Sequence, residues 1–243
     1  MRTSNGTWQQ LWRAFFPPKV WHGIIAIMVT APVMGYGLLM TIQTPWGVGP
    51  WDVLHLGLAR QLGITVGRAN QLAGAAIILL ILLLRGRTLT VVTVLNVITI
   101  GWWMDRFSAW GLVPYVDGWP GLLFLAAGIV VMGFGVALYL HPGQGAGPRD
   151  GLMVTLHERT GQPLYRIKIA MDLAALAGGW LLGGPVGIGT VMVAFGLGPV
   201  IDGFRTLLRR LEAGRAASEP AAGPERPAGT AAGPDGGTQA AGE

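Results

Sequence analysis

The sequence contains no cysteine, so disulfide bonds and thiolate metal sites are excluded. Charged residues are scarce as well. Asp, Glu, Lys and Arg make up 12% of the 243 residues, against roughly 25% in soluble domains. A chain with so few charges has little with which to cover a water-facing surface. The shortage therefore indicates that much of the surface faces lipid.

Apolar residues and glycine take the place of charge. Hydrophobic residues make up 51% of the chain, the mean hydropathy is +0.50, and glycine occurs 39 times. Glycine lets the backbones of membrane helices approach closely. The net charge of +5 comes from basic residues beside apolar runs, which indicates orientation in a lipid bilayer rather than binding to nucleic acid.

Six stretches are long and apolar enough to cross a bilayer, which takes about 20 helical residues. They cover residues 20–43, 67–85, 88–107, 120–140, 164–183 and 186–204. The first has an apolar run too long for a signal sequence, so we interpret it as a permanent span. The sequence thus predicts an all-α polytopic membrane protein with six transmembrane helices.

The distribution of lysine and arginine predicts the orientation. With the N-terminus in the cytoplasm, 14 of the 17 basic residues fall inside, and only Arg60, Arg68 and Arg106 fall outside. Cytoplasmic loops of membrane proteins carry an excess of basic residues. We therefore expect both termini in the cytoplasm.

Two terminal segments differ from the apolar body. Residues 1–19 mix aromatic and basic side chains, which predicts a cytoplasmic segment at the membrane interface. Residues 211–243 are rich in Ala, Gly and Pro with almost no large apolar side chain. Such a composition cannot offset its conformational entropy by burial, so we expect a disordered cytoplasmic tail.

The body of the chain repeats itself. A shift of 98 residues places Gly23–Gly63 on Gly121–Gly161, including a Met-Gly-aromatic-Gly sequence in both. After the loss of one residue, the shift becomes 97 and Asp105 falls on Asp202. The matches concentrate in Gly, Pro and Asp, which hydrophobic bias does not explain. We predict two transmembrane repeats, at residues 20–110 and 120–207.

Each repeat is expected to hold three spans and one short helix, at 52–62 or 150–160. About 11 helical residues reach only ~16 Å, half the hydrocarbon thickness. If the short helices do not cross, each repeat has three spans and the repeats are inverted. If they cross, each repeat has four spans and the repeats are parallel. Helix length favours inversion, whereas the charge distribution fits both arrangements.

A Gly-x-Gly-Pro-x-Asp element precedes each short helix. Proline suits a first helical turn, aspartate can accept its free N–H groups, and glycine allows close backbone contact. The element fits a capped turn at the interface, or a broken helix whose start points into a central cavity. Its duplication favours a shared site. The candidate substrate-binding residues are Gly47, Gly49, Pro50 and Asp52 with Gly145, Gly147, Pro148 and Asp150.

Charges at membrane depth add three candidates to this site. Asp172 lies near the middle of the fifth span, where a charge costs about 2.5–3.5 kcal/mol. It either pairs with Lys168, four residues earlier, or lines a polar path. Arg68 and Arg166 open the second and fifth spans at equivalent positions. They either extend to the surface or pair with the aspartates of the two elements.

The remaining polar residues indicate structure rather than chemistry. Asp105 and Asp202 end the third span of each repeat and are expected to have structural roles, and Asn96 is expected to bond another helix. No catalytic triad, phosphate loop or zinc cluster is recognisable. We therefore expect no enzymatic activity, metal or cofactor. Three histidines without metal-ligand spacing are expected in loops or interfaces: His55, His141 and His157.

The paired elements, each after a glycine-broken span and each followed by Gly63 or Gly161, resemble those of the YczE/YitT-type bacterial integral membrane proteins. The resemblance covers about residues 20–205, and the first copy, Gly47 to Leu54, carries it most clearly. The second copy departs from the pattern at Arg149, where an apolar residue is expected. The resemblance implies a multi-span protein of the bacterial plasma membrane and no particular substrate.

Our leading hypothesis is a small secondary transporter or permease-like protein for a small polar or anionic solute. The alternative is a non-transporting membrane scaffold or accessory protein for an envelope or export system, with a packed interior. An intramembrane enzyme would need paired catalytic groups, and only Asp52 and Asp150 could supply them. Candidate protein partners are a second copy of the chain or another membrane protein.

Overall fold

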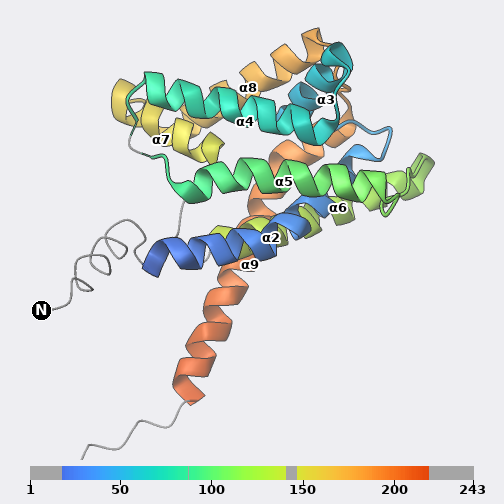
Figure 1. Ribbon diagram of the computed structural model, residues 1–243. Helices are drawn as coiled ribbons and strands as arrows, with labels where there is room; N and C mark the ends of the chain where they lie inside the picture. Colours follow the sequence, from blue (N-terminus) through green and yellow to red (C-terminus); the bar gives the residue numbers. More distant parts are fainter. Residues whose placement is uncertain (1–17, 87, 141–146, 219–243) are drawn as a thin grey trace, which may run out of the picture. The chain divides into compact units, whose positions relative to one another are not determined.

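The computed structural model describes residues 18–86, 88–140 and 147–218, where all regular structure is helical (Figure 1). The prediction of an all-α protein is confirmed for this part of the chain. Its eight helices are α2 (Pro18–Ile42), α3 (Pro50–Leu62), α4 (Val66–Leu83), α5 (Val91–Ala109), α6 (Gly118–Leu140), α7 (Pro148–Thr160), α8 (Leu164–Leu181) and α9 (Ile188–Ser218).

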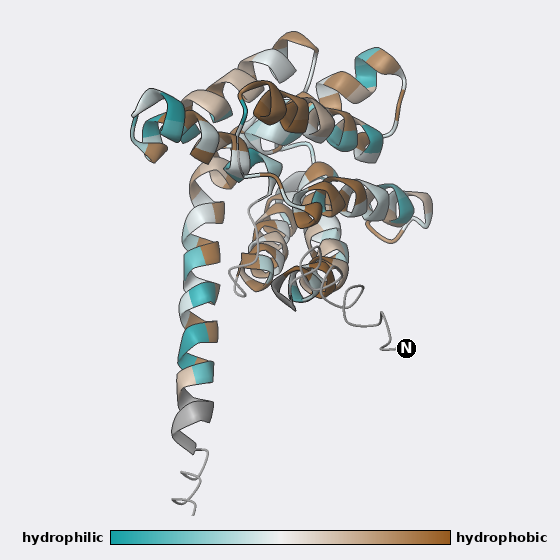
Figure 2. Ribbon diagram, turned by 60° about the vertical axis from the view of Figure 1, so that its left-hand side comes forward, coloured by the Kyte–Doolittle hydropathy of each residue, from teal (hydrophilic) through white to brown (hydrophobic). Residues whose placement is uncertain are grey.

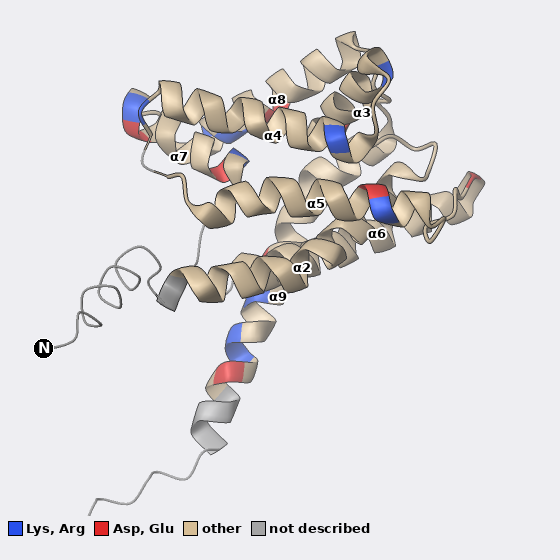
Figure 3. Ribbon diagram, viewed as in Figure 1, with Lys and Arg blue, Asp and Glu red and all other residues tan. Residues whose placement is uncertain are grey.

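Four of these helices are long and apolar enough to cross a membrane, namely α2, α4, α6 and α9. Figure 2 shows hydrophobic residues, in brown, along much of the helical body and repeated hydrophilic residues, in teal, on the long last helix. The sequence predicted six spans, and α5 and α8 coincide with the other two. Both have sufficient length but carry charges, Asp105 and Arg106 in α5 and three in α8, which lower their apolar character. Figure 3 shows how sparse charged residues are on the helices of the first unit.

The short helices α3 and α7 lie where the sequence predicted them, and each begins two residues earlier, at its proline. Each has 13 residues. Both end at a glycine with positive φ, +63° at Gly63 and +68° at Gly161, which explains why glycine recurs there. The bounds of α3 and α7 differ by the 98 residues of the sequence repeat, and so do those of α4 and α8.

Helices α2 and α6, which occupy equivalent places in the predicted repeat, pack side by side in antiparallel directions. Gly37 of α2 faces Met132 of α6, and Gly135 of α6 faces Met34 of α2. A Cβ atom on Gly37 would lie only 2.5 Å from the backbone nitrogen of Met132, so glycine is required for this approach. The two contacts are reciprocal, because Met34 and Gly37 match Met132 and Gly135 in the repeat.

The other helices exchange partners between the two halves. In one contact, Gly179 of α8 packs on the backbone of α3 at Val53 and Leu54. In the equivalent contact, Ile81 of α4 packs on α7 at Gly151, with Leu152 in the same apolar cluster. Thus the short helix of each half packs on the long helix that follows the short helix of the other half.

Asp105 has the structural role that was expected of it. Its carboxylate accepts hydrogen bonds from the Thr65 hydroxyl at 2.6 Å and from the Gly67 backbone N–H at 2.9 Å. These donors lie at the start of α4, where backbone N–H groups lack partners within the helix. The end of α5 is therefore fastened to the start of α4.

The chain forms two units, Met1–Leu208 and Arg209–Glu243. The described part of the second is the last stretch of α9. The expectation of disorder from residue 211 is wrong for 211–218, which are helical because Leu, Glu, Ala and Arg favour helix. The predicted segment 1–19, except for Pro18 and Lys19 in α2, and the tail after 218 lie outside the described residues.

Candidate functional site

The starts of α3 and α7 line the same cavity, which has a volume of about 450 Å³. Gly49, Pro50 and Asp52 contribute from α3, and Gly147, Pro148 and Asp150 contribute from α7. Each of the eight described helices supplies part of the lining. The two sequence elements that are 98 residues apart thus meet at one place in the first unit.

Both short helices begin without a side-chain cap. Gly49 and Gly147 are the N-cap residues, and a proline follows each in the first turn. A Cβ on Gly49 would lie 2.8 Å from Cγ1 of Val193 in α9, so glycine lets this helix start lie close to α9. A helix start presents unpaired N–H groups and a partial positive charge. Two such starts therefore face the cavity.

A hydrogen-bonded chain of three side chains joins the two halves of the protein across the cavity wall. The Oδ1 atom of Asp52 lies 3.2 Å from Nδ1 of His55, and Nε2 of His55 lies 3.3 Å from Nη2 of Arg149. Asp52 and His55 are 3% and 1% exposed. Because arginine only donates hydrogen bonds, Nε2 of His55 accepts and Nδ1 carries the proton that is donated to Asp52. This geometry requires the neutral imidazole.

Arg149 also stacks on the residue that occupies its own place in the other half. Its Cζ atom lies 4.7 Å from the ring centroid of Trp51, a distance typical of a cation–π contact. Positions 51 and 149 are where the two Gly-Pro elements differ. That difference places a guanidinium on a tryptophan ring, which forms a cation–π contact between the two elements.

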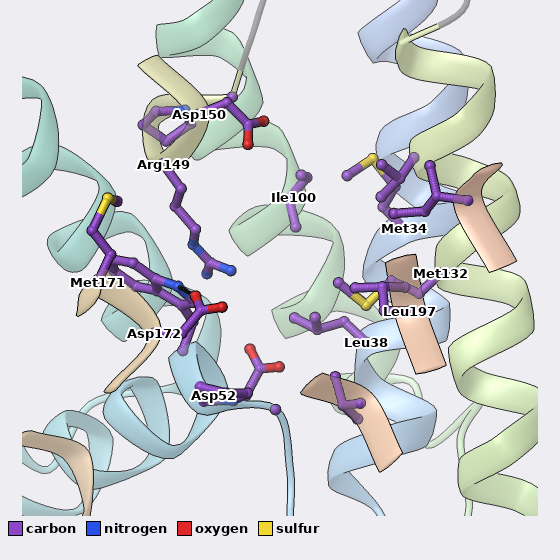
Figure 4. Close-up of a pocket in the computed structure, with 18 of the residues that line it drawn as sticks. Met34, Leu38, Asp52, Ile100, Met132, Arg149, Asp150, Met171, Asp172 and Leu197 are labelled. Carbon is purple, nitrogen blue, oxygen red and sulfur yellow. Dashed lines mark hydrogen bonds between the residues drawn. The ribbon is translucent and has the colours of Figure 1, made fainter. Parts of the chain in front are cut away.

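Asp172 completes the charged part of the site. The Trp51 Nε1–H donates to Oδ1 of Asp172 at 2.9 Å, and Nζ of Lys168 donates to Oδ2 at 2.6 Å. The predicted pair of Lys168 with Asp172 is confirmed, and Asp172 also lines the cavity. Figure 4 shows the Arg149 side chain extending toward Asp52 and Asp172. The half-buried guanidinium is stabilised by the Trp51 ring and by the carboxylates that line the same cavity.

The rest of the lining is largely apolar, with isolated polar groups. Met34, Ile100 and Met132 form part of the wall in Figure 4. Methionine side chains adapt to ligands of different shape. Tyr139 is 3% exposed, and its hydroxyl has no hydrogen-bond partner among the described residues. Asn96, 7% exposed, lines the cavity near Gly147, so the expectation that it serves only helix contacts was too narrow.

Three of the predicted site residues lie outside the cavity lining, and a fourth is not described. Gly47 has a φ of +91° and packs its backbone on Gly187, outside the lining. Gly145 lies outside the described residues. Arg68 and Arg166 are exposed and do not line the cavity, and Arg166 instead contacts Tyr165 and Gln162. The structure therefore does not bring these arginines to the aspartates, because long cationic side chains at helix starts can reach water.

Three residues that line the cavity were not among the candidates listed from the sequence: Trp51, His55 and Arg149. His55 was expected in a loop or interface, which is wrong, since it is buried within α3. His141 lies outside the described residues, and His157 is exposed at the end of α7. The signal for His55 was its position one helical turn after Asp52. The signal for Arg149 and Trp51 was their mismatch within otherwise matching elements.

Comparisons with known proteins cover this helical body. A family model described as "Family of unknown function (DUF6198)" matches residues 21–206. The uncharacterized membrane protein YczE of Bacillus subtilis (strain 168) is 32% identical over 171 residues, 70% of this chain and 79% of the relative. An uncharacterized protein of Haemophilus influenzae is 33% identical over 188 residues, 77% and 85% of the two chains. The uncharacterized protein YyaS of Bacillus subtilis is 26% identical over 182 residues, 73% and 90%. No solved structure matches.

Proposed function

Since the chain belongs to the DUF6198 family and is a multi-pass membrane protein homologous to YczE, we propose that it is a small secondary transporter or permease-like protein of the bacterial plasma membrane. One observation carries the proposal. Two helix starts from related parts of the sequence, together with the buried Asp52 and four further charged residues, line a single cavity in a largely uncharged protein.

The proposed arrangement has six spans in two inverted repeats. At 1.5 Å per residue, α3 and α7 reach only about 20 Å, too short for a hydrocarbon core of about 30 Å. The antiparallel packing of α2 on α6 supports inversion, because equivalent helices of parallel repeats would point the same way. The exchanged packing of α3 on α8 and of α7 on α4 also supports a local two-fold axis. The excess of basic residues supports cytoplasmic termini.

The chemistry of the cavity suits a small solute that carries charge. Helix starts and Arg149 attract anionic groups, and the carboxylates of Asp52, Asp150 and Asp172 attract cations. The proposal assigns these side chains to binding and not to catalysis. The reason is that His55, which is paired with Asp52, contacts the Arg149 guanidinium at its other ring nitrogen. A guanidinium is not a nucleophile, so this contact gives the histidine no nucleophile to activate.

The absence of cysteine makes a direct test feasible. We would introduce Met153→Cys, whose side chain lines the cavity, and treat right-side-out and inside-out vesicles with a membrane-impermeant charged maleimide. A transporter exposes its site to each side in turn, so labelling is expected from both faces. Asp117→Cys and Arg209→Cys, at exposed positions, are the controls and should each label from one face.

Labelling of the cavity cysteine from one face only would contradict transport. That outcome would favour the scaffold or accessory protein, in which the cavity is a static recess. Failure to label from either face would contradict transport equally, provided that the two control cysteines react.

A further inference from the structure

Two equivalent helix pairs, α4 with α5 and α8 with α9, differ in how closely they pack. Gly101 of α5 is buried, and a Cβ there would lie 2.5 Å from the carbonyl oxygen of Gly67 in α4. Gly198 holds the matching place in α9, yet it is exposed, and no neighbouring atom of the described residues lies within 4 Å of the position of its Cβ. The first pair is in contact at this level, whereas Gly198 meets no neighbour.

The matching aspartates differ in the same way. Asp105 accepts two hydrogen bonds at the start of α4. Asp202 has an 80% exposed side chain and a weak contact with Arg205 at 3.9 Å. The start of α8, which Asp202 would reach by analogy, has Pro163 as its N-cap and no side-chain cap. The Asp202 carboxylate can thus accept hydrogen bonds, and the first turn of α8 has N–H groups to donate, but no hydrogen bond between them is among those described.

The cavity is lined on this side by residues that remain exposed. Lys168 of α8 has a 61% exposed side chain, and Ala194, Phe195 and Gly198 of α9 are exposed although all four contribute to the lining. Val97, which matches Ala194 in the other half, is buried between helices. The exposure indicates that the cavity opens between α8 and α9.

Helix α9 has a point at which it can bend. Pro199 lies inside the helix, directly after Gly198 and three residues after Gly196. Proline has no N–H, so the carbonyl of Phe195 lacks its usual partner within the helix. Proline and glycine are the ordinary sites of helix kinks. The segment after Pro199 includes Asp202.

We propose that the part of α9 around this bend closes the cavity by docking on the start of α8, in the way that α5 contacts the start of α4. When this contact forms, the contact between α4 and α5 opens. In the closed form, Gly198 lies against the backbone at Tyr165, and Asp202 accepts N–H groups of the first turn of α8. This inference rests on the proposed transport function, and it names the two gates of the same cavity.

The residues at the two contacts also explain why the α4–α5 gate is closed and the α8–α9 gate is open in this structure. The α4–α5 contact joins two glycines and includes the Thr65 hydroxyl. The α8–α9 contact would join one glycine to Tyr165, with Pro163 in place of the threonine. Tyrosine keeps the backbones further apart than glycine does, and proline offers no hydroxyl. The second closure is therefore the weaker one.

Pairs of introduced cysteines test the closure in membranes. Gln71→Cys with Ile98→Cys spans α4 and α5, where the Gln71 amide already donates to the Ile98 carbonyl at 2.9 Å. The equivalent pair is Ile169→Cys with Phe195→Cys, both at exposed positions. With a short bifunctional thiol reagent, both pairs are expected to cross-link. Ile169→Cys with Ile188→Cys is the control, because Ile188 lies roughly 10 Å further along α9.

We expect the 169/195 pair to cross-link at least tenfold faster than the control pair, and Asp202→Asn to slow it by roughly tenfold through the loss of a charged acceptor. A 169/195 rate equal to the control, while the 71/98 pair reacts, would overturn the gate. If the Met153→Cys variant still labels from both faces in that case, transport stands and only this gate fails. Cross-linking of 169/195 with labelling from one face would support the closure and contradict transport.

Discussion

At the scale of single residues, the site depends on a guanidinium that belongs to one half of the protein and is held largely by the other. Arg149 contacts His55 and Trp51, and Trp51 in turn orients Asp172. A buried charge is costly when it is alone and tolerable when its partners are fixed around it. The difference between the two Gly-Pro elements is therefore important for the site, because it supplies the Arg149 guanidinium.

Removing the Arg149 guanidinium should reveal the free-energy cost of the polar groups that it stabilises. Arg149→Met is expected to lower the free energy of unfolding by about 1–3 kcal/mol, since it leaves Nε2 of the buried His55 without a donor and the buried Asp52 without a nearby cation. The double change Arg149→Met with Asp52→Asn should recover part of the loss. Thermal unfolding of the detergent-solubilised protein measures both. Equal stability of the single variant and the unchanged protein would refute the compensation.

The two roles of Trp51 can be separated by substitution. Trp51→Phe keeps an aromatic face for Arg149 but removes the N–H donor to Asp172, and it should cost about 1–2 kcal/mol. Trp51→Leu removes both contacts and should cost more. Trp180→Phe, at a 65% exposed position, is the matched control and should be nearly neutral in the same unfolding measurement. A reversed order of the two Trp51 variants would argue against the stacking.

At the scale of helices, glycine decides which elements can touch. The antiparallel contact of α2 with α6 has a glycine of each helix opposite a methionine of the other. Close approach in lipid depends on such small residues, because apolar burial does not distinguish one helix from the surrounding acyl chains. Glycines on α9 such as Gly203 face open space and have no such task in this conformation.

A methyl group should therefore have opposite consequences at two glycines. Gly37→Ala places a Cβ 2.5 Å from a backbone atom of α6 and is expected to destabilise the protein by about 1–3 kcal/mol. A Cβ at Gly203 meets no neighbouring atom of the described residues within 4 Å, so Gly203→Ala should stabilise α9 slightly, by up to about 1 kcal/mol. Urea or thermal unfolding in detergent compares the two variants. A neutral Gly37→Ala would contradict the tight contact.

At the scale of the whole first unit, the two halves differ in how far their last helices are closed. The α4–α5 pair is fastened by Asp105, whereas Asp202 is free of any such contact with α8 among the described hydrogen bonds. The proposed transport function accounts for this difference, because the cavity of a transporter opens to one side of the membrane at a time. The balance between the halves then depends on a few polar contacts.

Loosening the fastened pair should shift this balance. Asp105→Asn weakens the acceptor for Thr65 and Gly67, so the α4–α5 side is expected to open more often. In vesicles that also carry Met153→Cys, maleimide labelling should rise several-fold from the face that reacts more slowly in the unchanged protein. Asp117→Asn, in an exposed loop, is the control. An unchanged ratio of labelling between the faces would count against a gate at α4–α5.

From sequence alone one could determine the class of the protein, the positions of the helices and the family resemblance to YczE-type proteins, which the comparisons confirm. These follow from local properties, such as apolar length, proline at helix starts and glycine after helix ends. The same properties identified Asp52, Asp150 and Asp172 as unusual, because a charge in an apolar segment is visible without a partner.

Only the tertiary structure decided which of the unusual residues meet. Trp51 and Asp172 are 121 positions apart, and His55 and Arg149 are 94 apart, so no helical period relates them. Arg68 and Arg166 matched the repeat as well as the aspartates did, yet their side chains lie outside the cavity. The direction of a side chain between helices depends on how closely and at what angle the helices pack. That is set by contacts such as Gly37 on Met132, which join distant parts of the chain.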